Sequence, residues 1–334
     1  MSVESGRANR VAVVGGGSWG TALANAAACA GRDVTLWLRD PVGAAHIQKT
    51  RDNTRYLPGI PLHDQVRATC DESCLSEAGT VLLVTPAQTV REVLGQLRSH
   101  LGKASLVLCA KGIERGTDSF MSDVATETLP KATVAVLSGP SFAADVARGL
   151  PTAVTLACTD GAEAARLAGL ISGPAFRLYH TDDVRGVEIG GAGKNVLAIA
   201  SGIVAGRGLG ESARAALIAR AFAELMRFSK AYGGRAETLM GLSGLGDLVL
   251  TASSTQSRNF AFGDRLGRGA TPEKAAGGKL AEGAFTAAAL IALARARNVE
   301  MPIAEAVADV VSGTSDVDGV VARLLARPLK AETD

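Results

Sequence analysis

Residues 10–24 read Arg10-Val-Ala-Val-Val-Gly-Gly-Gly-Ser-Trp-Gly-Thr-Ala-Leu-Ala, an apolar run followed by a glycine turn. The unbroken apolar run is typical of a parallel strand that is covered on both faces. Gly15, Gly17 and Gly20 then form the pattern G-x-G-x-x-G. In this pattern the first glycine permits a tight turn, the second lets the backbone approach a pyrophosphate, and the third lets a helix pack closely on the strand. A helix from about Trp19 directs its free N–H groups at that anion. The stretch therefore predicts the first strand, turn and helix of a dinucleotide-binding fold.

Length and charge limit what the chain can be. It has 334 residues, of which 47% are hydrophobic, enough for two domains with sizeable cores. The net charge of +2, from 35 basic and 33 acidic residues, provides no broad cationic field of the kind that nucleic-acid-binding proteins use. A small-molecule ligand is therefore expected, and no nucleic acid. The polar N-terminus and the lack of a run of about eighteen apolar residues predict no signal peptide and no membrane span, and indicate a cytoplasmic protein.

Cysteine and histidine positions argue against a metal site. The odd number of cysteines shows no zinc or redox spacing, and the simplest interpretation is that all of them are buried, reduced thiols, at Cys29, Cys70, Cys74, Cys109 and Cys158. The four histidines are scattered and fit no metal spacing either. No metal is therefore expected.

A second strand is predicted at residues 33–40, Asp33-Val-Thr-Leu-Trp-Leu-Arg-Asp. The end of this strand contacts the adenosine ribose in a dinucleotide fold. An acidic residue there binds the 2′-hydroxyl of NAD, whereas an arginine can pair with the 2′-phosphate of NADP. Because Arg39 precedes Asp40, NADPH is expected to be accepted. Tyr56, in the turn-rich segment 53–59, is a further candidate cofactor contact.

The alternation of strands and helices continues along the first half of the chain. Further strands are predicted at residues 80–84, 105–110, 133–137, 153–157 and 176–180. Segments with helical spacing, such as 88–101, lie between them. This alternation predicts a doubly wound, Rossmann-type α/β domain over residues 1–183.

Two of these strands end in residues that can meet a ligand, because open parallel sheets bind at the carboxyl ends of their strands. One strand ends in Ala110-Lys111-Gly112, which makes Lys111 a candidate ligand-binding cation. Another ends in Ser138-Gly139-Pro140-Ser141-Phe142. There Pro140 and Ser141 predict a helix start whose exposed N–H groups can hold cofactor or substrate oxygens.

The composition changes after Asp183. From there on strand patterns stop and alanine-rich helical patterns take over, at 211–232, 282–298 and 303–311. We therefore predict an all-helical substrate and catalytic domain over residues 184–334. An alanine-rich helical domain often offers a face to a second copy, so a homodimer is expected.

The helical half carries the candidate chemistry. A carbonyl that accepts a hydride becomes an alkoxide, so a ketone reductase needs an acid beside that oxygen. Lys194, in Gly190-Gly-Ala-Gly-Lys-Asn, is predicted at the start of a helix, whose dipole, with desolvation and other cations, would lower the pKa of its amine. Asp247, in the glycine-rich segment 241–248, is the candidate carboxylate to orient it. Alone, either residue is more often a solvated charge or a helix cap.

A second candidate lies at Ser257-Arg258-Asn259. Ser257 is predicted to cap a helix, which places Arg258 and Asn259 in its first turn. A first-turn arginine beside free N–H groups makes an anion pocket, in which the guanidinium forks onto phosphate oxygens. The alternative is an ordinary capped helix with a solvated arginine.

With these motifs in order, the sequence resembles the bacterial NAD(P)-dependent glycerol-3-phosphate dehydrogenases over nearly its whole length. The resemblance rests on the glycine stretch and on Leu57-Pro-Gly, Ala110-Lys-Gly-Ile, Leu137-Ser-Gly-Pro-Ser-Phe-Ala, Gly193-Lys-Asn-Val, Gly241-Leu-Ser-Gly-Leu-Gly-Asp-Leu and Ser257-Arg-Asn. It implies an enzyme that interconverts dihydroxyacetone phosphate and sn-glycerol 3-phosphate with NADPH or NADH and supplies the backbone for phospholipid synthesis.

The resemblance also assigns site residues. It makes Lys194 the proton acceptor in the oxidation direction, and we assign the catalytic role to Lys194, Lys111 and Asp247. It implies a substrate site of Lys111, Gly139, Ser141, Lys194, Asp247, Ser257, Arg258 and Asn259. It implies cofactor contacts, beside the glycines and Tyr56, from Ser18, Trp19, Arg39, Lys111, Ala143, Arg258, Leu280 and Glu282. The resemblance is looser at Leu280 and Glu282, because the glutamate is kept while its neighbours vary.

Three other functions remain open from the residues alone. Dehydrogenases of the β-hydroxyacid or 6-phosphogluconate type share the helical second domain but space the lysine and asparagine several residues apart, whereas Lys194 and Asn195 are adjacent here. A methyltransferase also has a glycine turn after its first strand, but it needs an acid where Arg39 stands and no lysine base. A catalytically silent dinucleotide sensor would keep the turn but could lose Lys194 and Asp247.

Overall fold

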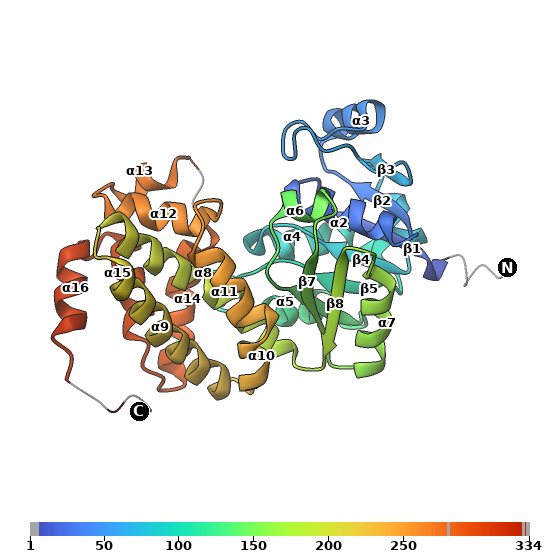
Figure 1. Ribbon diagram of the computed structural model, residues 1–334. Helices are drawn as coiled ribbons and strands as arrows, with labels where there is room; N and C mark the ends of the chain where they lie inside the picture. Colours follow the sequence, from blue (N-terminus) through green and yellow to red (C-terminus); the bar gives the residue numbers. More distant parts are fainter. Residues whose placement is uncertain (1–6, 279–280, 329–330, 332–334) are drawn as a thin grey trace. The chain divides into compact units, whose positions relative to one another are not determined.

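The computed structural model describes residues 7–278, 281–328 and 331, which divide into an α/β unit and a helical unit (Figure 1). Of these residues, the first unit comprises those up to Glu114, Ser119–Gly191 and Gly234–Asp247. The second comprises Arg115–Asp118, Ala192–Gly233 and those from Leu248 onward. The boundary predicted at residue 184 coincides with the first residue of helix α8 (Val184–Gly206), whereas the two units divide later, inside this helix.

The first unit is built on one sheet, with strand order β3-β2-β1-β4-β5-β6-β7-β8 in the described residues. The strands are β1 (Arg10–Val14), β2 (Asp33–Trp37), β3 (Val66–Thr69), β4 (Thr80–Leu83), β5 (Ser105–Leu108), β6 (Val134–Ser138), β7 (Thr152–Cys158) and β8 (Phe176–Thr181). Neighbouring strands are parallel except β6 and β7, which are antiparallel. The predicted doubly wound sheet is confirmed.

The sequence reading missed the edge strand β3. Only Val66 and Ala68 of its four residues are buried, and Arg67 between them is exposed. Such a short alternating segment at a sheet edge lacks the continuous apolar run that marks a strand covered on both faces. The remaining strands were predictable, including the half-covered β8 at the other edge, whereas this four-residue strand was not.

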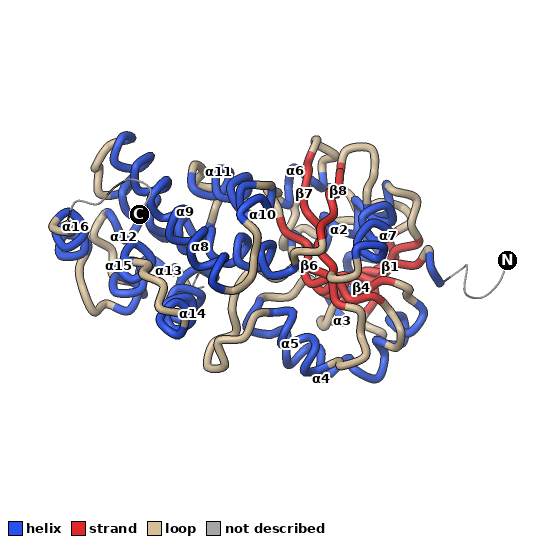
Figure 2. The backbone as a smooth tube through the Cα atoms, turned by 90° about the horizontal axis from the view of Figure 1, so that it is seen from below, coloured by secondary structure: helices blue, strands red, loops and turns tan. Residues whose placement is uncertain are grey.

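Helices cover both faces of the sheet. The helices of this unit, beside the start of α8, are α2 (Ser18–Cys29), α3 (Pro41–Thr50), α4 (Val90–Leu101), α5 (Met121–Thr128), α6 (Ala143–Ala147), α7 (Gly161–Ile171) and α10 (Ala236–Met240). Figure 2 shows α2 and α7 on one side of the strands and α4 and α5 on the other. Alternate residues of β1 pack on opposite faces of the sheet. Val11 and Val13 belong to one apolar cluster, and Ala12 and Val14 belong to the other. The glycine turn thus follows a strand that is buried on both faces.

The second unit is helical, as predicted. It contains the rest of α8 together with α9 (Glu211–Ala231), α12 (Arg258–Gly267), α13 (Pro272–Ala276), α14 (Glu282–Ala296), α15 (Pro302–Ser312) and α16 (Val317–Leu325), and most of α11 (Asp247–Ala252). Helices α8 and α12 cross at backbone distance, because a Cβ at Gly202 would lie 2.2 Å from the carbonyl oxygen of Phe260, and one at Gly263 would lie 2.1 Å from that of Ile199. Glycine at this crossing lets the two helices that carry the candidate site meet.

Helix α8 begins in the first unit and ends in the second. By length and composition it could cross a membrane, but 89% of its most apolar 18-residue window is buried inside the protein. Its first turns are fastened to α5 by Glu188, which accepts hydrogen bonds from the backbone N–H and the hydroxyl of Ser122, both at 2.7 Å. Desolvation raises the pKa of Glu188 to about 7, against the opposing effect of Arg185. The apolar helix is therefore a core element, held by a carboxyl group that titrates near neutral pH.

The cysteines are free thiols, but they are not all buried. Cys74, Cys109 and Cys158 are buried as predicted, whereas Cys29 and Cys70 are exposed. Cys29 is the last residue of α2 and Cys70 follows the edge strand β3, positions that face solvent at the ends of elements. The prediction of burial was wrong for these two.

Candidate functional site

The three glycines of the turn have different surroundings. Gly15 has a φ of +120°, and a Cβ there would lie 2.5 Å from the carbonyl oxygen of Val84. A Cβ at Gly20 would lie 1.8 Å from the carbonyl oxygen of Gly15. A Cβ at Gly17 would meet open space, and the φ of −75° and ψ of −179° of this residue suit any side chain. The outer two glycines are thus required by the fold, whereas the space beside Gly17 is open.

The start of α2 fits an anion. Ser18 is its first residue and Gly17 its N-cap, so no side chain caps the described first turn, which also lacks an acidic residue. Beside the turn, the buried Oγ1 of Thr85 has no hydrogen-bond partner among the described residues. Helix N–H groups without a cap and a buried hydroxyl without a partner are the features that a bound pyrophosphate would satisfy. Trp19 packs edge-on against Phe176, with the ring centroids 6.4 Å apart.

The end of β2 carries an exposed arginine. Asp40 accepts a hydrogen bond from the backbone N–H of Val42 at 3.0 Å and so caps α3. Its carboxylate therefore caps a helix, while Arg39, two residues after the end of the strand, is exposed. Tyr56 lies in an irregular segment, as predicted, and is 42% exposed. This distribution favours contact with a 2′-phosphate through Arg39 over contact with a 2′-hydroxyl through Asp40.

Four of the predicted substrate residues meet in the first unit. The Nζ of Lys111, just beyond β5, donates to the carbonyl oxygen of Gly139 at 3.1 Å and pairs with Oδ2 of Asp247 at 2.5 Å. The hydroxyl of Ser141 donates to the same carbonyl oxygen at 3.1 Å. Asp247 is only 2% exposed, so its ion pair is largely shielded from water. The fold thus joins Lys111 to a carboxylate far along the chain.

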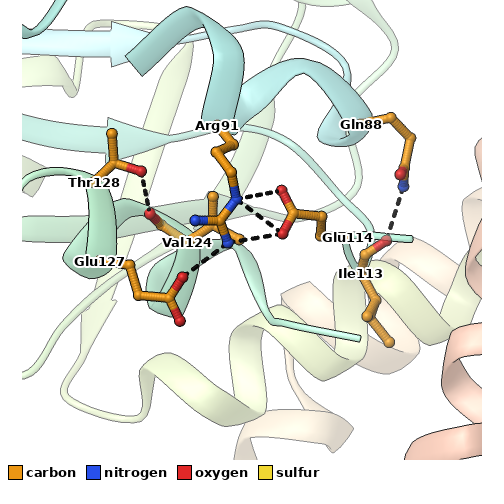
Figure 3. A network of polar contacts seen from close by, with 7 residues as sticks. All are labelled: Gln88, Arg91, Ile113, Glu114, Val124, Glu127 and Thr128. Carbon is orange, nitrogen blue, oxygen red and sulfur yellow. Dashed lines mark hydrogen bonds and ion pairs between the residues drawn. The ribbon is translucent and has the colours of Figure 1, made fainter. Parts of the chain in front are cut away.

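A polar network holds the segment that follows Lys111, and Figure 3 shows it. Gln88 donates to the carbonyl oxygen of Ile113 at 2.8 Å. Arg91, on α4, makes a forked ion pair with Glu114 and a second ion pair with Glu127 of α5. Because Ile113 is fully buried and Glu114 is 9% exposed, this short segment is fixed at both side chain and backbone. The backbone that carries Lys111 is therefore anchored on α4.

The predicted helix start at Pro140 and Ser141 was wrong by two residues. Helix α6 begins at Ala143, and Phe142 occupies the N-cap position with extended backbone. The reason is local, because the hydroxyl of Ser141 is bonded back to Gly139 and does not cap a helix. Ala143 remains at the first position of the helix, partly buried against the core of the sheet.

Lys194 lies inside a helix and not at the start of one. It follows the first residue of α8 by ten positions, so the prediction that it begins a helix was wrong. The nearby glycines serve close packing, since a Cβ at Gly190 would lie 2.8 Å from the carbonyl oxygen of Ser243 and one at Gly193 would lie 2.3 Å from a methyl group of Leu225. The dipole of a helix N-terminus therefore does not act on this amine.

Lys194 is buried, and its amine is oriented by a hydrogen bond. The residue is 8% exposed, and its Nζ donates to the hydroxyl oxygen of Thr251 on α11 at 2.7 Å. Sequence reasoning missed Thr251. The available signal was its spacing, one helical turn after Asp247, which places the two residues on the same face of α11.

Two asparagines that are hydrogen-bonded to each other, Asn195 and Asn259, connect three helices of the second unit. Asn259, in the first turn of α12, donates to the side-chain oxygen of Asn195 at 2.9 Å and accepts from the backbone N–H of Gly283 at 3.0 Å. Gly283 follows Glu282, the first residue of α14. Hydrogen bonds of Asn259 thus connect α12 to α8, which carries Lys194, and to α14, which begins at Glu282. Leu280, predicted beside Glu282, lies outside the described residues.

The predicted helix cap at Ser257 is confirmed. Its hydroxyl accepts from the backbone N–H of Phe260 at 3.3 Å, and α12 begins at Arg258. Arg258 is exposed, whereas Ser257 and Asn259 on either side of it are buried. A cation is thus presented at a helix N-terminus, where phosphate is bound well.

A thiol near Lys111 is unsuited to act as a nucleophile. Cys109 lies two residues before the lysine and is buried, and desolvation raises the pKa of its thiol to about 12. Only the thiolate is an effective nucleophile, so this group stays inert at neutral pH. The amines and carboxylates carry the candidate chemistry of the two units.

Comparison with known proteins identifies the family of the chain. A family model described as NAD-dependent glycerol-3-phosphate dehydrogenase N-terminus matches residues 10–164, and the corresponding C-terminus model matches residues 183–322. A protein of Methylobacterium radiotolerans named glycerol-3-phosphate dehydrogenase [NAD(P)+] is 73% identical over 96% of this chain and 98% of its own length. A protein of the same name from Azorhizobium caulinodans is 60% identical, over 97% and 98%.

The fold agrees as well. The crystal structure of glycerol-3-phosphate dehydrogenase from Coxiella burnetii has a TM-score of 0.89 and 39% identity, and the match covers 96% of this chain and 99% of that one. The two family models cover parts of both units, and the relatives match almost the whole chain. The chain belongs to the family of NAD(P)-dependent glycerol-3-phosphate dehydrogenases.

Proposed function

We propose that this chain interconverts dihydroxyacetone phosphate and sn-glycerol 3-phosphate, with Lys194 as the general acid and base. When bound, the nicotinamide cofactor supplies a hydride to C2 of the ketone or takes one up from the alcohol. In the reduction, the ammonium group of Lys194 gives its proton to the oxygen that was the carbonyl. In the oxidation, the neutral amine takes the hydroxyl proton.

The observation that carries this proposal is the buried amine of Lys194. Its hydrogen bond to Thr251 fixes the nitrogen, and its burial keeps bulk water from the proton that it exchanges. An acid or base is effective only where its atom is held within hydrogen-bond reach of the reacting oxygen. A fixed amine in the same unit as the Ser257-Arg258-Asn259 turn suits a substrate with a carbonyl and a phosphate.

The other polar residues are proposed to bind the substrate. Arg258 and Asn259, at the start of α12, would hold the phosphate, with Ser257 as the cap of that turn. Lys111 and Asp247, which pair with one another, would with Gly139 and Ser141 contact the triose. Binding energy from the phosphate, remote from C2, would then orient the reacting carbon.

We further propose that the glycine turn and the start of α2 bind the cofactor pyrophosphate. The open space at Gly17 and the uncapped first turn support this role. Arg39 would pair with the 2′-phosphate of NADPH, and NADH would also be accepted. The remaining contacts are proposed for Ser18, Trp19, Gly20, Tyr56, Lys111, Ala143, Arg258, Glu282 and, outside the described residues, Leu280.

The family resemblance and the sequence also support proposals about pathway, location and assembly. The product would supply the backbone for phospholipid synthesis in the cytoplasm, and the enzyme would act as a homodimer. We also propose that residues 1–183 bind the cofactor and that residues 184–334 bind the substrate and carry out catalysis. The family assignment favours this substrate over those of the β-hydroxyacid and 6-phosphogluconate dehydrogenases.

A spectrophotometric assay tests the activity directly. Oxidation of NADPH and of NADH, followed separately at about 340 nm, should depend on added dihydroxyacetone phosphate. A β-hydroxyacid and 6-phosphogluconate, each offered with the oxidised cofactors, serve as controls and should give no signal. Turnover of either control at a rate similar to that of the triose phosphate would contradict the proposal.

Replacing Gly17 by alanine tests the cofactor cradle. The backbone angles of Gly17 suit alanine and its Cβ meets open space, so the melting temperature should stay the same or rise slightly. The added methyl group would occupy the space proposed for the pyrophosphate. We expect the Kd for NADPH, measured by fluorescence titration, to rise at least about tenfold.

The matched control is Gly20→Ala, a substitution of the same size in the same turn. Its Cβ would lie 1.8 Å from the carbonyl oxygen of Gly15, so this variant should lose stability as well as cofactor binding. An unchanged Kd in Gly17→Ala would remove the glycine turn from the cofactor site.

A further inference from the structure

The side chain of Asn53 lies against the glycine turn. Its Nδ2 donates to the carbonyl oxygen of Gly16 at 2.9 Å and to Oγ1 of Thr21 at 2.8 Å. Asn53 is only 3% exposed, and it comes from the irregular segment after α3, distant from the turn in the sequence. A buried amide thus uses both of its protons on the element that is proposed to hold the pyrophosphate.

The bond to Gly16 determines where a neighbouring N–H points. A trans peptide unit is planar, so the carbonyl of Gly16 and the N–H of Gly17 point in opposite directions within one plane. Holding that carbonyl oxygen toward Asn53 therefore turns the N–H of Gly17 away from the amide. This N–H lies at the open position of the turn, where a ligand would be met.

Thr21 fixes the next peptide unit in the same way. Its backbone N–H and its hydroxyl both donate to the carbonyl oxygen of Gly17, at 3.0 and 2.9 Å. That carbonyl shares its peptide plane with the N–H of Ser18. Because the Thr21 hydroxyl donates to Gly17, it is left to accept from Asn53. The amide and the hydroxyl together orient the N–H groups of Gly17 and Ser18.

Asn53 also begins the turn that carries Tyr56. Its carbonyl oxygen accepts from the backbone N–H groups of Tyr56 and Leu57, at 3.1 and 2.8 Å. Leu57 is buried, which ties this turn to the core, while Tyr56 remains 42% exposed. One residue therefore connects the position of the glycine turn with that of a proposed cofactor contact.

We propose that Asn53 is a positioning residue for the dinucleotide. It orients the N–H donors of Gly17 and Ser18 through the carbonyl of Gly16 and the hydroxyl of Thr21, and it does not itself touch the cofactor. This inference rests on the proposed role of the glycine turn in binding the pyrophosphate.

Asn25 provides a matched control, because it fastens the same segment to α2 away from the turn. Its Nδ2 donates to the carbonyl oxygen of Pro61 at 2.9 Å, and its Oδ1 accepts from the backbone N–H of His63 at 3.0 Å. At 6% exposure it is buried to nearly the same extent as Asn53. Loss of either amide loosens the segment, but only the loss of Asn53 releases the glycine turn.

The test compares Asn53→Asp with Asn25→Asp. Aspartate has the same shape, but its carboxylate cannot donate to the carbonyl oxygen of Gly16 and repels it. We expect Asn53→Asp to raise the Kd for NADPH about tenfold or more in a titration without substrate, and Asn25→Asp to change it less than about twofold. At saturating NADPH, kcat and the KM for dihydroxyacetone phosphate should stay within about threefold of the unmodified protein in both variants. An equal rise in Kd for the two variants, or no rise for Asn53→Asp, overturns the proposal.

Thr21→Val is a second variant that removes the shared hydroxyl while keeping the size of the side chain. It should raise the Kd for NADPH by about threefold, and the double variant with Asn53→Asp should bind no more weakly than Asn53→Asp within about twofold, because both act on one network. Fully multiplicative effects would show independent actions and overturn the proposal. Gly17→Ala distinguishes failure of the proposed cofactor site from failure of the positioning role. If Gly17→Ala leaves the Kd for NADPH unchanged, the proposed cofactor site fails. If Gly17→Ala weakens NADPH binding while Asn53→Asp does not, only the positioning role of Asn53 fails.

Discussion

Lys194→Ala is expected to lower kcat by about 10³-fold, the range that a positioned acid or base contributes. The variant loses the group that gives a proton to the developing alkoxide, and neither Thr251 nor the neighbouring Asn195 can replace it. Because Lys194 is proposed to touch the substrate oxygen and not the nucleotide, the Kd for NADPH should stay within about twofold. Steady-state turnover and a fluorescence titration measure the two quantities.

Lys230→Ala is the matched control for this variant. Lys230 lies in the last turn of α9, in the same unit, and is exposed. Removing it takes away the same charge from the protein and should leave kcat within about twofold, since a solvated surface cation contributes little. A kcat for Lys194→Ala within about tenfold of the unmodified protein would contradict the role of this amine.

Arg258→Ala is expected to raise the KM for dihydroxyacetone phosphate by about 100-fold, because hydrogen bonds from a forked guanidinium to phosphate are lost. The unphosphorylated analogue dihydroxyacetone cannot make these bonds, so its slow turnover should change little. The difference between the two substrates therefore isolates the phosphate contact. Initial rates over a range of each substrate at saturating NADPH measure it.

The control for Arg258 lies at the other end of the same helix. Arg268, the C-cap of α12, is largely exposed and pairs with Asp264, so Arg268→Ala should leave the KM within about twofold. An equal loss with dihydroxyacetone in Arg258→Ala would count against a phosphate contact, and would indicate instead that the start of α12 had been disturbed.

Features that depend on a few neighbouring residues could be predicted from the sequence. The apolar run of β1 and the three glycines after it define a strand, a turn and a helix through local backbone geometry. Ser257 could be recognised as a cap because its hydroxyl bonds to a backbone N–H three residues later. The half-covered edge strand β3 shows the limit of this approach, since its short alternation of buried and exposed residues is not distinctive.

The position of Lys194 shows where local reasoning fails. Clustered glycines destabilise an isolated helix, so they predicted a helix start. In the folded protein, the same glycines lie inside α8, because Ser243 and Leu225 pack where side chains would otherwise be. Tertiary packing supplies the stabilisation that the local sequence lacks, and no local pattern records the partner.

Local backbone preferences and hydrophobic periodicity made several features predictable: the alternating α/β domain, the helical second half, the glycine turn and the residue types available for catalysis. Three contacts could be recognised only in the folded protein: Lys111 pairs with Asp247, Thr251 accepts a hydrogen bond from Lys194, and the amide of Asn53 donates to the glycine turn. These contacts join residues separated by tens of positions or more. Which distant side chains meet depends on how whole elements pack, and that information is not contained in any single stretch of the chain.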